Sequence, residues 1–502
     1  MEQGTGQGVA FPAVDGRRSS QATARAVVAA AAAAVDPALA AAVESEPDWR
    51  HAYVGHLRRL TVAAARSEAA AASVATAGLD AVHGRFTFRR GDDELPLDAA
   101  LGLDAAAPRL VPVAGTAPHP ASLGLPHGDA VLTGAALRRR LDAWTDAGVL
   151  EPSCAQAVRL VADNPDWLDL SDLTFVLLGA AAEVGPLLPL CRWGARVVAL
   201  DVRDAAVTSR IVSAARQGSG RLLLPARERV DDDADLVGAA GIDLLTELPE
   251  ARRLLDQVEG PLVVGNYAYA DGAAFARLAA GVDALVADLQ RSRPGLAIAH
   301  LATPTDAFAV PEECVEAARR RLAEAGALRR GTAAVLRGVS GRRLLVPNYR
   351  EAVTADDGRI LGVADALVVQ QGPNYALAKR LQRWRAEVAV LAGVTTSANV
   401  APAAYTRSVL RNRLLAAAYA GARRFGIEVF QPATAATLMA ALLVHDLRNP
   451  AGSAPGSAAS AARPVSDLFA RSAAHGGLWR VAWEPRSALG LAAITGIASR
   501  RR

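Results

Sequence analysis

The spacing of apolar residues changes near residue 170. From Gln21 to Ala77 the apolar positions recur at helical spacing, and many of them are alanine. After residue 170, short apolar runs alternate with longer stretches of helical periodicity. Because a strand buried on both faces reads as a short continuous apolar run, this second part of the chain predicts alternating strands and helices.

This alternation predicts an α/β fold, with a doubly wound, mainly parallel Rossmann-type sheet and an added helical N-terminal region. The predicted helices of the sheet domain are Val184–Trp193, Ala273–Gln290, Pro311–Ala325 and Tyr375–Leu391. The predicted strands are Thr174–Leu178, Arg196–Leu200, Ile242–Leu245, Pro261–Gly265, Leu296–Leu301, Ala366–Gln370 and Val394–Val400.

The same patterns divide the chain into segments. We expect residues 1–21 to be disordered and residues 22–170 to form the helical region, with a long proline-containing loop at 104–127. The sheet domain covers 171–448, and an insertion at about 306–364 interrupts its alternation of strands and helices. Residues 449–464 read as a flexible linker rich in Ala, Gly and Ser, and 465–502 as a C-terminal tail.

Composition indicates a protein with a large buried core and argues against a nucleic-acid-binding protein. Hydrophobic residues make up 51% of the 502 positions, so a large core can be buried. The net charge of +4 is mild for this length, and no basic stripe is interleaved with aromatic residues, which argues against nucleic acid. Pairs and triplets of arginine are typical of solvated helix faces, with an anionic ligand as the alternative.

Three widely spaced cysteines without a CxxC pair exclude a zinc ribbon or a disulfide scaffold and indicate a reducing compartment. We expect a cytoplasmic protein, because no signal peptide and no transmembrane segment is recognisable. The eight histidines include no HExxH motif, so no metal is expected. Neither a GxSxG elbow nor a P-loop is present.

The turn after the first predicted strand has the character of a cofactor-binding turn. Gly179, Ala182 and Gly185 occupy the positions of a GxxGxxG turn that also contains Glu183 and Val184. Small residues there would let backbone amides face a pyrophosphate. Asp201 lies at the end of the second strand, where a carboxylate can accept hydrogen bonds from ribose hydroxyls, so NAD is preferred over NADP.

The only lysine of the chain lies four residues after a tyrosine. Lys379 is the single lysine among 55 basic residues, and it follows Tyr375 at the spacing that puts both side chains on one helix face. A neighbouring ammonium would lower the pKa of the phenol. We therefore expect Tyr375 to exchange a proton with a carbonyl oxygen during hydride transfer.

Together these residues resemble the short-chain dehydrogenase/reductase family. The resemblance rests on Gly179–Gly185, Asp201, Tyr375-x-x-x-Lys379 and the strand that ends at Pro402, and it covers about 174–410. It implies that Tyr375 donates or accepts the proton, and that Lys379 binds the nicotinamide ribose. Asn266 falls where the family ends a strand with Asn-Asn-Ala-Gly, which implies a place beside the cofactor.

The chain differs from the family at the position of the catalytic serine. No Ser or Thr lies between Ala355 and Asn374, where the family has its serine. Thr303 is the preferred substitute, since it closes the strand before the insertion; Thr305, Ser340 and Gln371 are further candidates. Ala182 and Glu183 stand where glycines are common in the turn.

These observations predict an NAD(P)-dependent oxidoreductase that interconverts an alcohol and a carbonyl. The substrate would be a small molecule, apolar or anionic. Two alternatives stay open: an S-adenosylmethionine-dependent methyltransferase, because that cofactor binds a similar turn and acid, and a non-catalytic NAD(P)-binding protein. A homo-oligomer is compatible with the sequence.

Overall fold

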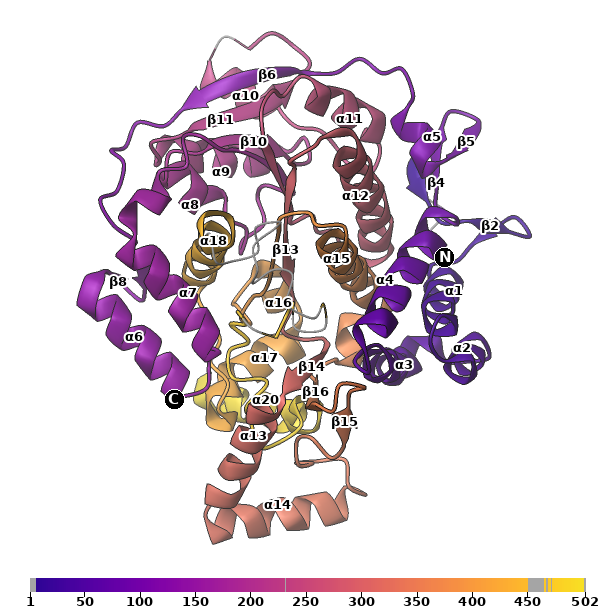
Figure 1. Ribbon diagram of the computed structural model, residues 1–502, viewed down its shortest axis with the longest axis vertical. Coiled ribbons are helices and arrows are strands. Elements are labelled where there is room, and N and C mark those ends of the chain that lie inside the picture. The colour runs from indigo at the N-terminus through magenta and orange to yellow at the C-terminus, as the bar shows by residue number, and fades with distance from the viewer. Residues whose placement is uncertain (1–5, 231, 450–464, 466–467, 471, 501–502) are drawn as a thin grey trace.

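A central sheet with helices on both faces dominates the computed structural model (Figure 1). The structure describes residues 6–230, 232–449, 465, 468–470 and 472–500. The indigo N-terminal helices lie outside the helices on one face, and the orange and yellow C-terminal helices gather near one end of β13 (Figure 1). No helix in these ranges is long and apolar enough to cross a membrane.

The central sheet has seven strands, of which six are parallel. Numbered along the chain, the parallel strands lie in the order 6-5-4-1-2-3, which fits a Rossmann-like sheet. The chain therefore winds outward in both directions from the boundary between β9 and β12. Across the sheet the strands are β17 (Thr396–Val400), β13 (Ala297–Ala302), β12 (Leu262–Asn266), β9 (Thr174–Leu178), β10 (Arg196–Leu200), β11 (Arg221–Ala226) and the antiparallel β6 (Arg109–Ala114).

Helices bury both faces of this sheet. Val176 and Leu178 of β9 belong to one apolar cluster, while Phe175 and Leu177 belong to the other, as alternation along a strand requires. The prediction of an α/β fold with a mainly parallel sheet is thus confirmed. The first face packs on α11 (Leu248–Asp256), α12 (Gly272–Ser292) and α15 (Pro373–Leu391); the second packs on α7 (Pro152–Asp163), α8 (Leu187–Arg192), α9 (Ala205–Arg216) and α18 (Pro432–Arg448).

The N-terminal helices form a further layer against α15. Ser19, Asp36 and Ser67 cap three of them by accepting backbone N–H groups with their side chains. Gly78 lies beneath the ring of Trp384, where a Cβ atom would be only 2.4 Å from the ring. The four helices are α1 (Ser20–Ala33), α2 (Pro37–Glu44), α3 (Trp49–Ala64) and α4 (Glu68–His83).

The rest of the N-terminal part contains more strands than the sequence predicted. Residues 8–18, expected to be disordered, include β1, whose Val9 is fully buried and donates to Leu245 O. The loop expected at 104–127 contains β6, because an edge strand tolerates Pro112. The other elements are β1 (Gly8–Ala10), β2 (Ala13–Val14), β3 (Arg17–Arg18), β4 (Thr87–Arg90), β5 (Asp93–Pro96), α5 (Leu97–Leu101), β7 (Leu125–His127), β8 (Ala130–Leu132) and α6 (Gly134–Asp146).

Two predicted strands of the main sheet are wrong, and β11, one of its parallel strands, was not foreseen. Ile242–Leu245 is a turn before α11, because the Asp243 carboxylate accepts the N–H of Leu245. Ala366–Gln370 ends in a 3₁₀ turn, where the Gln371 side chain accepts the N–H of Val368. β11 was missed although it is almost wholly buried. Short apolar runs do not by themselves distinguish strands from buried turns.

The segment expected to be an insertion forms a small sheet of its own. β14 (Ala307–Pro311) and β15 (Ala352–Thr354) pair with the central β16 (Ile360–Asp365). Helices α13 (Glu312–Glu324) and α14 (Ala327–Val339) connect the first strand to the others and extend away from the main sheet (Figure 1). Its first strand begins a few residues after β13 ends, so the segment is attached beside the carboxyl edge of the main sheet.

The C-terminal helices cover this same edge. α17 (Arg413–Gly421) crosses α20 (Pro485–Arg500) through Gly421 and Gly496, where added Cβ atoms would be 2.0 Å and 1.9 Å from backbone oxygens. The tail is also anchored by His475, which contacts the buried Glu151 carboxylate at 2.9 Å. Residues 450–464 of the expected linker lie outside the described residues. The shorter helix α16 (Arg407–Arg411) connects the last strand to α17.

Candidate functional site

The residues singled out from the sequence follow successive strands at the carboxyl edge of the sheet. Gly179 follows β9, Asp201 follows β10, Asn266 closes β12 and Thr303 follows β13. Parallel strands end at one edge, and ligands of such sheets bind there, at the point where the strand order reverses. In this fold that point lies between β9 and β12.

Gly179 fills the first position of the turn for a steric reason. Its φ is +82°, and a Cβ atom would lie 2.5 Å from the Cα of Ala268, in the loop after β12. The two loops beside the reversal point therefore touch at Gly179. The helix expected from Val184 starts only at Leu187, because the N–H of Gly185 donates to Ala182 O and prolongs the turn.

Protein acceptors already engage most of the amides in this turn. The N–H groups of Gly179 and Ala180 donate to Leu200 O, and that of Ala182 donates to Gly179 O. Asp201 accepts the N–H of Ala181 and that of Val202, each at 2.8 Å. Burial raises the pKa of the Asp201 carboxyl. Asp201 thus joins the turn to the end of β10.

Glu183 does not face the sheet but binds the C-terminal part of the chain. Its carboxylate accepts the backbone N–H of Arg407 at 2.7 Å and the Nε–H of Arg407 at 3.0 Å. Val184 packs against the apolar cluster of the second sheet face. From the sequence, both residues were expected only as members of the turn, and no local pattern indicated the contact with Arg407.

Tyr375 lies at the N-terminal end of α15 and meets Thr303. The Thr303 side chain lies close enough to the phenol to lower its pKa, whereas the larger effect of burial raises it. Thr303 Oγ1 lies 2.8 Å from Thr305 Oγ1, which accepts the Gln371 amide at 2.7 Å. Three of the four candidates for the role of the catalytic serine are thus connected to one another, and the fourth, Ser340, lies at the end of α14.

Lys379 lies one turn further along α15 and contacts other groups. Its Nζ donates to Gln382 Oε1 at 2.9 Å and to Leu301 O at 3.4 Å. The amide of Gln382 in turn donates to Asn266 Oδ1 at 3.3 Å. The structure therefore connects Lys379 with Asn266 through Gln382, a residue that its i+3 spacing on the same helix could have revealed.

One expectation about this pair needs correction. The sequence suggested that the ammonium lowers the pKa of Tyr375, but the group that lowers it is Thr303. Burial lowers the pKa of Lys379 itself to about 8, against a smaller opposite effect of Asp306. Asp306 is engaged by Arg380 and Arg383, at 2.7 Å and 2.9 Å.

Aromatic side chains surround the phenol of Tyr375. The ring of Phe275 lies 5.6 Å from that of Tyr375 and 5.0 Å from that of Tyr269. Tyr419 of α17 is close enough to Tyr375 for the two phenols to influence each other, and burial with this contact raises the pKa of Tyr419. The sequence did not predict this cluster, because its members come from three separate segments.

A buried histidine lies under the same helix. His300 of β13 is the register partner of Asn266, is 2% exposed, and finds no protein partner for either ring nitrogen within the described ranges. Burial lowers its pKa to about 3, so the ring is neutral. Nearby, Asp283 accepts two hydrogen bonds from Arg385 and one from His83.

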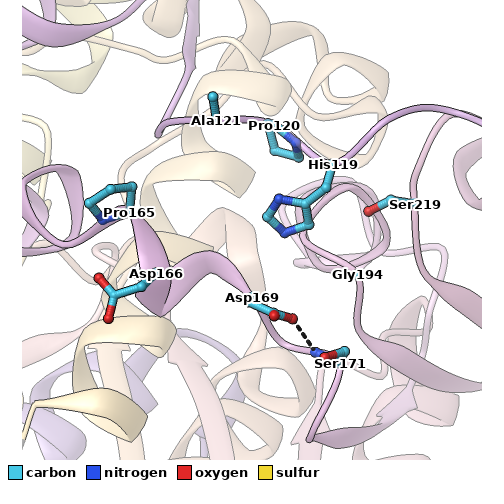
Figure 2. Close-up of a pocket in the computed structure, with 9 residues that line it drawn as sticks. All are labelled: His119, Pro120, Ala121, Pro165, Asp166, Asp169, Ser171, Gly194 and Ser219. Carbon is cyan, nitrogen blue, oxygen red and sulfur yellow. Dashed lines mark hydrogen bonds between the residues drawn. The ribbon is translucent and has the colours of Figure 1, made fainter.

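A separate cleft of about 590 Å³ opens at the amino edge of the sheet (Figure 2). His119, Asp166 and Asp169 line it, and the Asp169 carboxylate accepts the N–H of Ser171 at 3.1 Å (Figure 2). This cleft is remote from the strand ends that carry the predicted residues. Across the described residues, no three His, Cys, Asp or Glu side chains are grouped so that they could hold a metal ion.

Comparison of the chain with protein-family models, with curated proteins and with solved structures finds no match.

Proposed function

We propose that the protein is an NAD(P)-dependent oxidoreductase that interconverts an alcohol and a carbonyl. One observation carries this proposal: the Thr303 side chain lies close enough to the Tyr375 phenol to lower its pKa, at the carboxyl edge of the parallel sheet and one helical turn from the only lysine. A phenol beside a hydroxyl at this edge is suited to exchange a proton with a substrate oxygen.

The strand order supports a Rossmann-type dinucleotide-binding domain. β9, β10 and β11 extend to one side of the reversal point, and β12, β13 and β17 extend to the other. A dinucleotide binds across this point in folds of this order. The resemblance to short-chain dehydrogenases/reductases leads to the same cofactor.

Several residues at this edge would hold a dinucleotide. Asp201, which follows β10 and binds the turn after β9, would hold the adenosine ribose, and Lys379 and Asn266 the nicotinamide side. NAD is preferred over NADP, because a carboxylate at the end of the second strand can accept hydrogen bonds from the ribose hydroxyls.

Tyr375, Thr303 and the aromatic neighbours have distinct roles in the proposed reaction. The cofactor, when bound, supplies or accepts the hydride. Burial raises the pKa of Tyr375, so the phenol is protonated at neutral pH and donates its proton to the carbonyl oxygen in the direction of reduction. Thr303 orients the phenol and stabilises the phenolate that remains. The aromatic neighbours, Phe275 among them, favour a substrate with an apolar body.

A non-catalytic NAD(P)-binding protein is the second candidate. It is favoured by the contacts of Lys379, whose ammonium binds Gln382 and Leu301 O instead of the phenol. This candidate and the methyltransferase alternative differ from the oxidoreductase in cofactor and turnover, so one set of measurements separates the three.

The test combines binding and turnover. Thermal stability is measured with NADH, NADPH and S-adenosylmethionine for wild type, for Asp201→Asn, and for the control Asp256→Asn on α11. We expect NADH to stabilise wild type and the control, and Asp201→Asn to lose this effect. NADH oxidation is then followed with a panel of apolar ketones and aldehydes. Stabilisation by S-adenosylmethionine alone refutes the oxidoreductase, and NADH binding without turnover on any carbonyl supports the second candidate.

A further inference from the structure

Helix α16 bridges the two loops beside the reversal point. At its start, Arg407 binds Glu183 in the turn after β9 through both its backbone N–H and its Nε–H. At its end, Arg411 binds Asp271, which follows β12, at 3.3 Å. The helix therefore connects the loop after β9 to the loop after β12, with one guanidinium paired to each loop.

The Glu183 and Asp271 carboxylates bind these arginines instead of stabilising the turn and the helix to which they belong. Asp271 occupies the N-cap position of α12, yet its side chain makes no capping bond; it accepts the Tyr269 hydroxyl at 2.8 Å in addition to Arg411. Both ion pairs are accessible to water, with side-chain exposures of 56% for Arg407 and 74% for Arg411. Exposed pairs of this kind are weak, so another anion can replace either carboxylate.

The turn itself has few donors left for an anion. The N–H groups of Gly179, Ala180 and Ala182 already donate to backbone oxygens, and Ala181 donates to Asp201. Glu183 adds a negative charge where a pyrophosphate would approach. A diphosphate at this crevice therefore needs cations from outside the turn, and guanidinium groups bind phosphate oxygens with two parallel hydrogen bonds.

We propose that Arg407 and Arg411 are the diphosphate-binding groups of this site, and that a bound diphosphate replaces Glu183 and Asp271 as their partner. The identity of the ligand as a dinucleotide rests on the proposed function; the anion-binding role of the two arginines rests on the geometry of α16. Glu183 is then a competitor of the cofactor, in contrast to its role as a turn ligand in the sequence-based prediction.

Calorimetric titration with ADP-ribose, which carries the diphosphate but no nicotinamide, tests this role. We expect Arg407→Gln and Arg411→Gln each to weaken binding by about tenfold, the loss of one charged hydrogen-bonded contact. Arg413→Gln, an exposed arginine two residues beyond α16, is the matched control and should bind as wild type does. Equal affinity in all three variants, or no binding of ADP-ribose to wild type, overturns the proposal.

Removing the competing carboxylates should have the opposite effect. Glu183→Gln and Asp271→Asn keep the size of each side chain but free its arginine, so both variants should bind ADP-ribose several times more tightly than wild type does. Weaker binding in Glu183→Gln would mean that this carboxylate holds the ligand directly, which contradicts the proposal. Melting curves of each variant without ligand verify that the fold is intact.

The outcomes for this inference and for the proposed function are separable. Binding of ADP-ribose that depends on Arg407, without oxidation of NADH by any carbonyl, counts against the oxidoreductase and leaves the arginine site standing. Carbonyl reduction with unchanged ADP-ribose affinity in Arg407→Gln leaves the oxidoreductase standing and overturns the arginine site.

Discussion

The side chain of Thr303 lies close enough to the phenol of Tyr375 to lower its pKa. Thr303 leaves β13 just before the small inserted sheet, and Tyr375 follows that sheet at the start of α15. The inserted segment therefore separates the two residues in sequence while the main sheet brings them together. This contact gives the proposed reaction its most direct tests.

Tyr375→Phe should abolish most of the activity while preserving the fold. The substitution removes the proton donor but keeps the ring that packs against Phe275. We expect kcat to fall by about 10²- to 10⁴-fold, the usual contribution of a general acid, with little change in melting temperature. Steady-state kinetics and a melting curve check this. A variant that retains wild-type kcat would remove Tyr375 from the mechanism.

Thr303→Ala should move the pH dependence of alcohol oxidation. Thr303 lowers the pKa of Tyr375, so its removal lets that pKa rise further. Oxidation needs the phenolate as base, and the rising limb of kcat against pH should therefore shift to higher pH. Thr303→Ser, which keeps the hydroxyl, should leave the limb near its wild-type position. A shift to lower pH in Thr303→Ala would contradict the effect of Thr303 on the pKa of Tyr375.

The single lysine should matter more for activity than for stability. Arginine is the basic residue at the other 54 positions, but its planar guanidinium cannot replace a compact ammonium bound to Gln382 and Leu301 O. We expect Lys379→Arg to lower kcat/KM at least tenfold, about 1.4 kcal/mol of barrier. If the variant and the wild type had the same kcat/KM, Lys379 would have no role in the reaction.

Lys379 should also make stability depend on pH. Burial lowers its pKa from 10.5 to about 8, so between these values the unfolded chain binds more protons than the folded protein does. The destabilisation is complete below pH 8 and is relieved as the pH rises toward 10.5. Lys379→Met should therefore raise the free energy of unfolding at neutral pH, with a gain that shrinks at alkaline pH. Denaturant titrations of both proteins at several pH values measure this, and a gain that grows with pH would contradict it.

Gly179→Ala should destabilise the protein by about 2–4 kcal/mol. A positive φ costs a residue with a Cβ about 1–2 kcal/mol, and the close approach of Ala268 adds the cost of overpacking. Gly295→Ala is the matched control, because that glycine also has a positive φ of +77° but has no atom within 4 Å of its Cβ position. Urea denaturation compares the two. Equal losses would show that the contact with Ala268 is unimportant.

Asp306→Asn should be among the most damaging single changes near the site. The carboxylate is 3% exposed and neutralises the buried Arg380 and Arg383. Its loss removes the carboxylate that both buried guanidinium groups share, and breaking a buried pair typically costs about 3–5 kcal/mol. Asp357→Asn, which breaks an exposed pair with Arg359, should cost less than about 1 kcal/mol. Denaturant midpoints of the two variants provide the comparison.

The sequence was sufficient for the features that depend on short stretches of chain. The apolar runs of β9 and β10 identify a strand–turn–helix–strand unit, because burial of both strand faces leaves a continuous apolar pattern. The spacing of Tyr375 and Lys379 on one helix face follows from helix geometry alone. The candidate Thr303 could be named because it follows a predicted strand.

Features that join distant segments could not be predicted from the sequence. β6 pairs with β11, Thr303 meets Tyr375, and α16 bridges two loops, yet no local pattern marks any of these contacts. For the same reason the sequence did not show that Lys379 binds Gln382 and Leu301 O instead of the Tyr375 phenol, because these contacts depend on how α15 lies over β12 and β13.

Periodicity along the chain thus determined which elements form and which of their faces are buried. The path of the chain through space decided which strand ends meet, which side chain lowers the pKa of Tyr375, and which two loops the arginines of α16 join. The physical reason is that local pattern fixes backbone conformation and burial, whereas hydrogen bonds and ion pairs between distant residues depend on the packing of the whole domain.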